Sequence, residues 1–209
     1  MTIRILFLGE GSSDDGIADH IETIAADRGV EVSITNPELD RLGKVGHALP
    51  DKLGAVRALG GEYELVAVHR DADGMGRQAR MSEIETAVRE HMPQVVHVPI
   101  IPVRMTEAWL LVDESAIRRV AGNPNGRCRL GLPPLKQMES VNDPKAELKR
   151  ALATASELTG RKLERFNRRF SENRRQLLQR LDSDGPITTL PSWRAFVRDV
   201  EAGLQSLGC

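Results

Sequence analysis

The sequence predicts an α/β protein built on a mainly parallel sheet that is flanked by helices, with a helical extension at its C-terminal end. Short apolar runs alternate with segments whose apolar residues recur at helical spacing, which is typical of strand–helix–strand units with right-handed crossovers. One run, residues 65–68, is apolar at every position, as in a strand that helices cover on both faces. Together these patterns indicate parallel strands with helices on either side.

The first half of the chain supplies the strands. We expect strands over residues 3–8, 30–35 and 95–102, and a central strand that leads into Asp71. The expected helices between them carry apolar residues three or four apart, with Ser82 and Glu85 at the spacing of a capping box in the third. The segment 36–50 is expected to be a loop, and its glycines around Lys44 lack the full phosphate-loop signature.

Helices are expected to dominate the second half. Residues 105–113 are strongly apolar and indicate a helix with Glu107 near its beginning. Residues 122–143 are rich in Gly, Pro and Asn, which indicates a linker. Asp143 and Pro144 then form an N-cap followed by proline at the first helical position. We therefore divide the chain into an α/β domain over residues 1–121, a linker over 122–143 and a basic helical region over 144–209.

Composition and charge describe a soluble globular protein. Hydrophobic residues make up 40% of the 209 residues and charged residues 28%. The net charge of −1 is unevenly distributed, because residues 1–143 carry a net −6 and residues 144–209 a net +5. The two cysteines, Cys128 and Cys209, indicate neither a disulfide framework nor a thiolate zinc site. No apolar run has the ~18 residues of a membrane span, so we expect a cytoplasmic protein without a membrane partner.

Acidic residues follow the expected strands at three places. Glu10 comes after the first strand, Asp71 and Asp73 after the central strand, and Glu107 just beyond the last. Carboxyl ends of parallel strands meet at one edge of a sheet, and carboxylate oxygens are the ligands that Mg²⁺ prefers. The alternative is that acids at strand ends cap helices or face water, and no single one of these motifs separates the two interpretations.

The order of these acids resembles the Toprim superfamily of topoisomerases, primases and nucleases. Toprim domains carry a glutamate after the first strand and an Asp-x-Asp after a later one, in a small Rossmann-like sheet. Residues 10–14 (Glu-Gly-Ser-Ser-Asp) and 69–74 (His-Arg-Asp-Ala-Asp-Gly) are similar to these motifs. Residues 107–111 (Glu-Ala-Trp-Leu-Leu) are similar to a segment of small stand-alone Toprim-like proteins of prokaryotes. The resemblance covers residues 1 to about 120.

The resemblance implies a Mg²⁺- or Mn²⁺-dependent nuclease. Asp71 and Asp73 would bind the cation, and Glu10 would be a further ligand or the general acid/base. Glu107 has an open role, either in the site or in packing, and Lys145 is a candidate counterpart of the downstream lysine that some of these nucleases use. Tyr63 is the only tyrosine and no DNA-gate domain is visible, which argues against strand passage.

The same resemblance implies a partner protein, and it leaves other functions open. Small stand-alone Toprim-like proteins resemble the nuclease half of two-component systems whose other half is an ATPase. By this resemblance the chain would be the effector of a prokaryotic defence system, active alone or only with its partner. A non-enzymatic Toprim module that binds such an ATPase is the alternative, and assembly into a homo-oligomer is left open. Haloacid-dehalogenase-type phosphatases also carry Asp-x-Asp-Gly, but after the first strand, whereas here two strands and two helices precede Asp71.

The C-terminal region offers a candidate surface for nucleic acid. Eight Lys or Arg residues fall between residues 161 and 180 against two Glu, and a row of arginines there could follow a phosphate backbone. The alternatives are a solvated basic face or a dock for an acidic partner. Aromatic residues form only 3% of the chain, which argues against a base-stacking platform. The arginines of this candidate surface are Arg161, Arg165, Arg168, Arg169 and Arg175.

Overall fold

A computed structural model describes residues 2–39 and 45–208, and it divides into two compact units. The sheet unit comprises Met1–Arg70, Met75–Ile101 and Ala195–Cys209, and the helical unit comprises Asp71–Gly74 and Pro102–Arg194. This division does not follow the boundaries at 121 and 143 drawn from the sequence. The final helix contributes to both units, and the chain enters the helical unit at Pro102, well before the expected linker. Lys44 and its glycine neighbour Gly43 lie outside the described residues.

Four parallel strands form the core of the sheet unit, in the order β2-β1-β3-β4. Every residue of β3 is buried, because helices cover both faces of the sheet. The α/β fold with a parallel sheet that the sequence predicted is therefore confirmed, as is the helical C-terminal region. The strands are β1 (Ile3–Leu8), β2 (Val32–Thr35), β3 (Leu65–His69) and β4 (Val96–Ile100).

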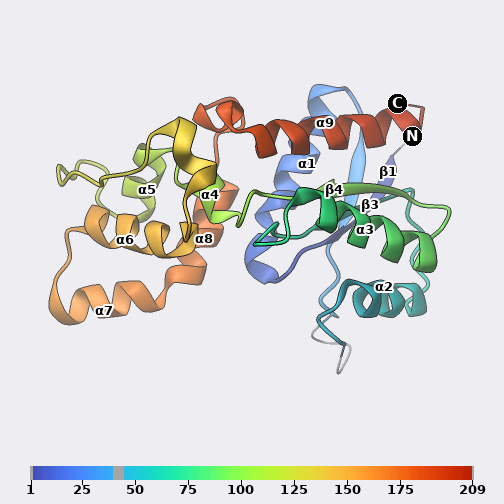
Figure 1. Cartoon of the computed structure of the whole chain (residues 1–209), viewed down its shortest axis with the longest axis horizontal. Helices are drawn as coiled ribbons and strands as arrows, with labels where there is room; N and C mark the ends of the chain where they lie inside the picture. The colour runs from blue at the N-terminus through green and yellow to red at the C-terminus, as the bar shows by residue number, and fades with distance from the viewer. Residues whose placement is uncertain (1, 40–44, 209) are drawn as a thin grey trace. The chain divides into compact units, whose positions relative to one another are not determined.

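The helices of the sheet unit lie in two layers (Figure 1). One face carries α1 (Gly16–Asp27) and the later part of α9 (Pro191–Ser206), which an ion pair between Arg28 and Glu201 joins. The other face carries α2 (Leu49–Ala58) and α3 (Arg77–His91). Helix α9 packs closely, since a Cβ atom on Gly203 would come within 2.6 Å of the Val98 side chain on β4.

Helix α3 begins earlier than the sequence indicated. It starts at Arg77 after Gly76, whose φ of 82° only glycine adopts without strain. Ser82 lies inside the helix, so the capping box predicted from Ser82 and Glu85 is wrong. An isolated Ser-x-x-Glu spacing cannot locate a helix start when a glycine turn upstream sets the entry.

The helical unit is built around two tryptophans. The rings of Trp109 and Trp193 meet edge to face with centroids 5.1 Å apart, and Trp109 Nε1 donates a hydrogen bond of 2.7 Å to Ser192 Oγ. Its α-helices, besides the first turn of α9, are α4 (Glu107–Leu110), α5 (Glu114–Val120), α6 (Pro144–Ser156), α7 (Gly160–Arg168) and α8 (Phe170–Gln179). Short 3₁₀ helices at Leu135–Ser140 and Pro186–Thr189 complete the unit.

Two predictions from the sequence meet the structure in this unit. Asp143 caps α6 by accepting a 2.8 Å hydrogen bond from the Ala146 backbone N–H, and Pro144 is the first helical residue, as expected. The helix expected over 105–113 is only one turn long, from Glu107 to Leu110, before Asp113 starts α5. Within the described part of the chain, no helix is both long and apolar enough to cross a membrane.

Candidate functional site

Glu10 lies just beyond the carboxyl end of β1, in the turn of residues 9–11. This position is the topological switch point, because β1 lies between β2 and β3 and the connections leave it in opposite directions. The Glu10 Oε1 atom is 3.2 Å from Nη1 of Arg70, which directly follows β3. A second contact of 3.1 Å joins Arg70 Nη2 to Glu83 on α3. The switch point thus holds a carboxylate and a guanidinium in contact.

A buried pair of polar residues holds the Glu10 turn in place. Asp14 Oδ2 accepts hydrogen bonds of 3.1 Å from the backbone N–H groups of Glu10 and Gly11. The same oxygen is 3.2 Å from His69 Nδ1, and both side chains are almost fully buried. Because an ionised carboxylate only accepts hydrogen bonds, the proton of this contact belongs to His69 Nδ1. The pair therefore joins the ends of β1 and β3 beneath Glu10.

Sequence reasoning missed this pair. Acids are common at helix starts, and Asp14 does lie in a 3₁₀ helix (Ser12–Asp14) ahead of α1, so its position in the sequence gives no sign of a buried partner. A signal was present in His69, which ends a strand buried on both faces. A histidine there needs a buried hydrogen-bond partner.

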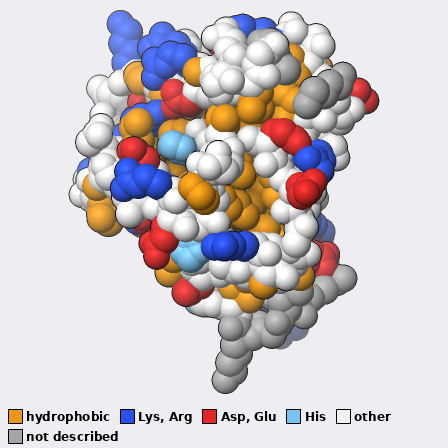
Figure 2. Space-filling view, turned by 90° about the vertical axis from the view of Figure 1, so that its right-hand side faces the viewer, with side chains coloured by type: hydrophobic (Ala, Val, Ile, Leu, Met, Phe, Trp, Pro, Cys, Tyr) orange, Lys and Arg blue, Asp and Glu red, His pale blue; other side chains and the backbone are white. Residues whose placement is uncertain are grey.

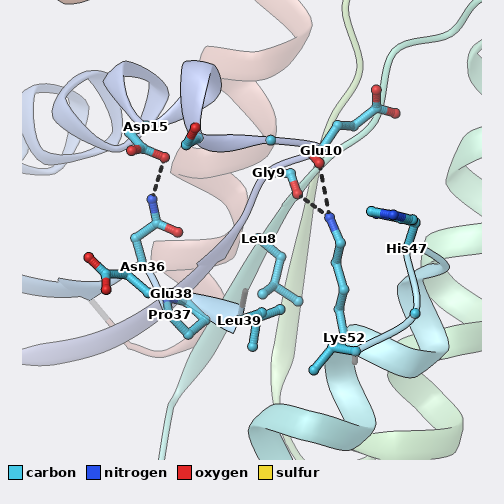
Figure 3. Close-up of a pocket in the computed structure, with 14 residues that line it drawn as sticks. Leu8, Gly9, Glu10, Asp15, Asn36, Pro37, Glu38, Leu39, His47 and Lys52 are labelled. Atoms are coloured by element: carbon cyan, nitrogen blue, oxygen red, sulfur yellow. Dashed lines mark hydrogen bonds between the residues drawn. The ribbon is translucent and has the colours of Figure 1, made fainter. Parts of the chain in front are cut away.

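A cavity of about 680 Å³ opens beside the turn in the sheet unit (Figure 3). Lys52 from α2 crosses one side of it, and its Nζ donates to the backbone carbonyls of Gly9 at 2.7 Å and Glu10 at 3.2 Å. On the other side, Asn36 donates a 2.7 Å hydrogen bond to Asp15. His47 lies next to Lys52 and is exposed. The cavity is open to solvent, and more of its lining surface is polar than apolar.

Asp71 and Asp73 belong to the helical unit. Asp71 Oδ1 accepts hydrogen bonds from the backbone N–H of Thr106 at 2.9 Å and from its hydroxyl at 3.2 Å. Thr106 is fully buried, so it fixes the orientation of the half-buried Asp71 carboxylate. Asp73 is exposed and adopts a φ of 46°, in the left-handed region that few non-glycine residues occupy. Its backbone N–H donates to Arg104 O at 2.9 Å, which holds this turn.

Glu107 takes part in a buried ion pair. Its Oε1 accepts a 3.0 Å hydrogen bond from Arg174 Nε on α8, and the exposed fractions of the two side chains are 5% and 8%. Sequence reasoning missed Arg174, which lies on the same side of α8 as the buried Leu177 and Leu178. An arginine on an apolar helix face needs a buried acid, and Glu107 is that acid.

The remaining predicted residues lie on the helical unit's surface. Lys145 is exposed in the first turn of α6. The predicted arginines are all exposed as well. They are divided between two helices, because α7 ends at Arg168 and α8 begins at Phe170. Arg169 at the junction donates a 2.8 Å hydrogen bond to Glu172. Figure 2 instead shows the sheet unit, from the right of Figure 1, where acidic and basic side chains are interspersed.

The cation site predicted from the sequence takes Glu10 from the sheet unit and both aspartates from the helical unit. Its convergence on one ion therefore stays a prediction. Within residues 2–39 and 45–208, no group of three or more His, Cys, Asp or Glu side chains is already arranged to hold a metal ion. Comparison of the chain with models of protein families, with curated proteins and with solved structures finds no match.

Proposed function

We propose that this chain is a Mg²⁺- or Mn²⁺-dependent nuclease of the Toprim kind, which cleaves phosphodiester bonds of nucleic acid. The observation that supports the proposal best is the Glu10–Arg70 contact at the switch point of the sheet. Ligands of open parallel sheets bind in the crevice at this point. An acid beside a guanidinium there suits a ligand that combines a cation with a phosphate.

Three carboxylates would hold the cation, namely those of Glu10, Asp71 and Asp73. Their oxygen atoms suit a hard divalent ion. The hydrogen bonds from Thr106 would hold the Asp71 carboxylate in a fixed orientation while it binds the ion. When bound, such a cation stabilises charge on the phosphate and activates or orients the attacking oxygen. The exposed side chain of Asp73 would be accessible to the cation and to the substrate.

Arg70 would bind the substrate phosphate. Its Nε atom is buried without a hydrogen-bond partner among the described residues, so the guanidinium is incompletely satisfied where it lies. Once the Glu10 carboxylate turns to a cation, the contact at Nη1 is released for a phosphate oxygen. The Asp14–His69 pair would keep the Glu10 backbone in place during this exchange. Lys145, at the start of α6, stays a candidate for a second phosphate contact.

Cleavage of labelled DNA and RNA tests the proposal. The wild-type chain should cleave at least one of them with Mn²⁺ and lose this activity in excess chelator. Asp71→Ala and Glu10→Gln should each abolish cleavage, whereas Asp27→Ala, which removes an exposed acid of α1, should leave it intact. Activity that survives Asp71→Ala or the chelator would overturn the metal mechanism.

A partner-binding module is the second candidate. Two of the predicted acids, Glu10 and Glu107, are already paired with arginines, which also suits a fold that has kept these residues for structure alone. In that case an ATPase partner should co-purify with the chain from its native host. The purified chain should then cleave no nucleic acid, and Glu10→Gln should leave the complex intact.

A further inference from the structure

A groove of about 360 Å³ is lined by residues of α6, α7 and α8 in the helical unit. Figure 1 shows where these three helices lie in the chain. None of the carboxylates discussed above lines this groove. Most of the surface that lines it is apolar, and it is open to solvent. The residues lining the groove are Lys149, Arg150, Leu152, Ala153, Phe166, Asn167, Phe170 and Asn173.

Two aromatic rings line this groove. The chain has four phenylalanines. Two of them, Phe7 and Phe196, are fully buried in the sheet unit. The other two, Phe166 on α7 and Phe170 on α8, are only partly buried and both reach the groove. Lys149 Nζ lies 5.0 Å from the centroid of the Phe170 ring, so a positive charge stands beside an aromatic surface.

A polar amide lines the same groove. Asn173 is only 6% exposed as a whole residue, and in the described part of the chain its side-chain amide makes no hydrogen bond. Its nitrogen and oxygen still contact solvent in the groove. The amide offers two N–H donors and a carbonyl acceptor, so a ligand with both an acceptor and a donor on one edge can replace that solvent.

The surroundings of the groove are strongly basic. Residues 144–180 hold eleven Lys or Arg against four Glu. Arg150 and Arg169 are paired with Glu147 and Glu172, whereas Arg161, Arg165 and Arg168 are exposed along α7 without an ion pair among the described residues. An occupant of the groove should therefore carry negative charge next to an apolar part.

We propose that this groove binds a base of a single-stranded nucleic acid, with its flanking phosphates on the lysines and arginines around it. A base has flat faces that stack on phenylalanine, and its edge carries the donors and acceptors that an asparagine amide binds. In a duplex both the faces and the pairing edge are occupied, so the groove selects single strands. An acidic peptide would match the charge, and its backbone could bind the amide, but an aliphatic peptide has no flat face to stack on the phenylalanine rings.

This inference rests on the proposed nuclease function and names its substrate class. It departs from the expectation from composition that the chain has no base-stacking platform, and the experiment below decides between the two. A low overall aromatic content does not exclude such a platform, because half of the phenylalanines gather at one groove.

Binding without cleavage tests the inference. Fluorescence anisotropy of labelled oligonucleotides with the full chain in chelator measures affinity while the metal-dependent step is blocked. A short single strand should bind about tenfold more tightly than an abasic strand of equal length and charge, since each stacked base contributes to affinity. The same excess is expected over a duplex of that length.

Matched variants separate stacking from charge and from folding. Phe166→Leu and Phe170→Leu fill the groove without a ring and should weaken single-strand binding about tenfold, whereas Phe166→Trp should preserve it. Asn173→Leu should weaken binding, whereas Gln179→Leu, on the same helix but outside the groove, should not. Fluorescence of the buried Trp109 and Trp193 verifies that each variant is folded.

Equal binding of the normal and abasic strands would overturn the inference, as would unchanged affinity in folded Phe166→Leu and Phe170→Leu. Binding of a labelled acidic, leucine-containing peptide in place of single strands would overturn it too and would assign the groove to a protein partner. Failure of the nuclease proposal looks different. In that case ring-dependent binding of single strands persists in chelator, but no cleavage follows when Mn²⁺ is supplied.

Discussion

Asp14 Oδ2 accepts hydrogen bonds from two backbone N–H groups of the Glu10 turn and contacts the Nδ1 atom of His69, so one buried oxygen connects the turn that follows β1 to the end of β3. Asp14→Asn replaces one of the two oxygens by a donor and removes the charge. We expect it to destabilise the sheet unit by about 1–3 kcal/mol, because a buried partner is left unsatisfied. Hydrogen exchange should show the amides of Glu10 and Gly11 losing protection first.

A matched control is Glu22→Gln, which likewise turns a carboxylate into an amide, but at an exposed position in the middle of α1. It should alter neither the unfolding free energy nor the exchange at Glu10. Equal protection of the turn in Asp14→Asn and wild type would show that Asp14 does not hold Glu10 in place.

Breaking the Glu107–Arg174 pair should strongly destabilise the helical unit, and a second substitution should restore most of the stability. Glu107→Ala removes the carboxylate that binds the buried guanidinium of Arg174, which should lower the free energy of unfolding by about 3–5 kcal/mol. Replacing both residues, with Glu107→Leu and Arg174→Met, should restore most of the loss, because no buried charge then remains. Urea unfolding followed by tryptophan fluorescence reports this, since both tryptophans lie in the helical unit.

The same variants decide the role of Glu107. If the double variant is stable and still cleaves nucleic acid, Glu107 is structural. If instead the double variant is stable but inactive, and Glu107→Ala alone costs little stability, then the pair is not mainly a packing element.

Asp113 gives the helical unit a pH dependence. Burial alone would raise the pKa of Asp113, but hydrogen bonds from Ser115 and Ala116 hold it below its ordinary value. The unfolded chain therefore takes up the proton first as pH falls. The stabilisation by the ionised cap is complete above the ordinary pKa of about 3.9 and is lost as pH falls through the lower folded value.

We expect Asp113→Ala to lower the free energy of unfolding by about 1 kcal/mol at neutral pH, as loss of an N-cap does. The difference from wild type should shrink below pH about 4. Asp113→Asn keeps a capping oxygen without a titrating group and serves as the control. Its stability relative to Asp113→Ala should not change with pH, and urea titrations across the acid range measure both.

The exposed arginines of α7 should supply salt-dependent affinity for nucleic acid. Reversing two of them, with Arg165→Glu and Arg168→Glu, should weaken binding and reduce the salt slope by about two phosphate contacts. The control pair, Arg57→Glu and Arg89→Glu, changes the net charge equally on exposed helices of the sheet unit. Equal effects of the two pairs would mean that only net charge matters and that α7 is not a binding surface.

Local patterns in the sequence were sufficient for the sheet and most helices. The apolar run of β3 and the cap at Asp143 each depend on a few neighbouring residues, so they could be recognised directly. The contacts missed, Asp14 with His69 and Glu107 with Arg174, join residues 55 and 67 positions apart. A lone buried polar residue shows that a partner exists, but only the fold shows which residue it is.

The division of the chain into two units could not be predicted from local patterns either, for a related reason. The apolar face of α9 is visible in the sequence, yet its periodicity does not say which surface it covers. Likewise, Phe166 and Phe170 are four residues apart, a spacing that by itself predicts one face of a continuous helix. The helix break at Arg169 places them on two helices that share a groove with α6.

The return of α9 to the sheet has a consequence for how the protein forms during synthesis. Gly203 and its neighbours cover Val98 and Leu65, so the sheet unit cannot be completed when its four strands have emerged from the ribosome. More than ninety residues, Pro102–Arg194 among them, must be translated first. Until then one face of the nascent sheet is only partly covered, and the helical unit has the opportunity to fold before the sheet that precedes it.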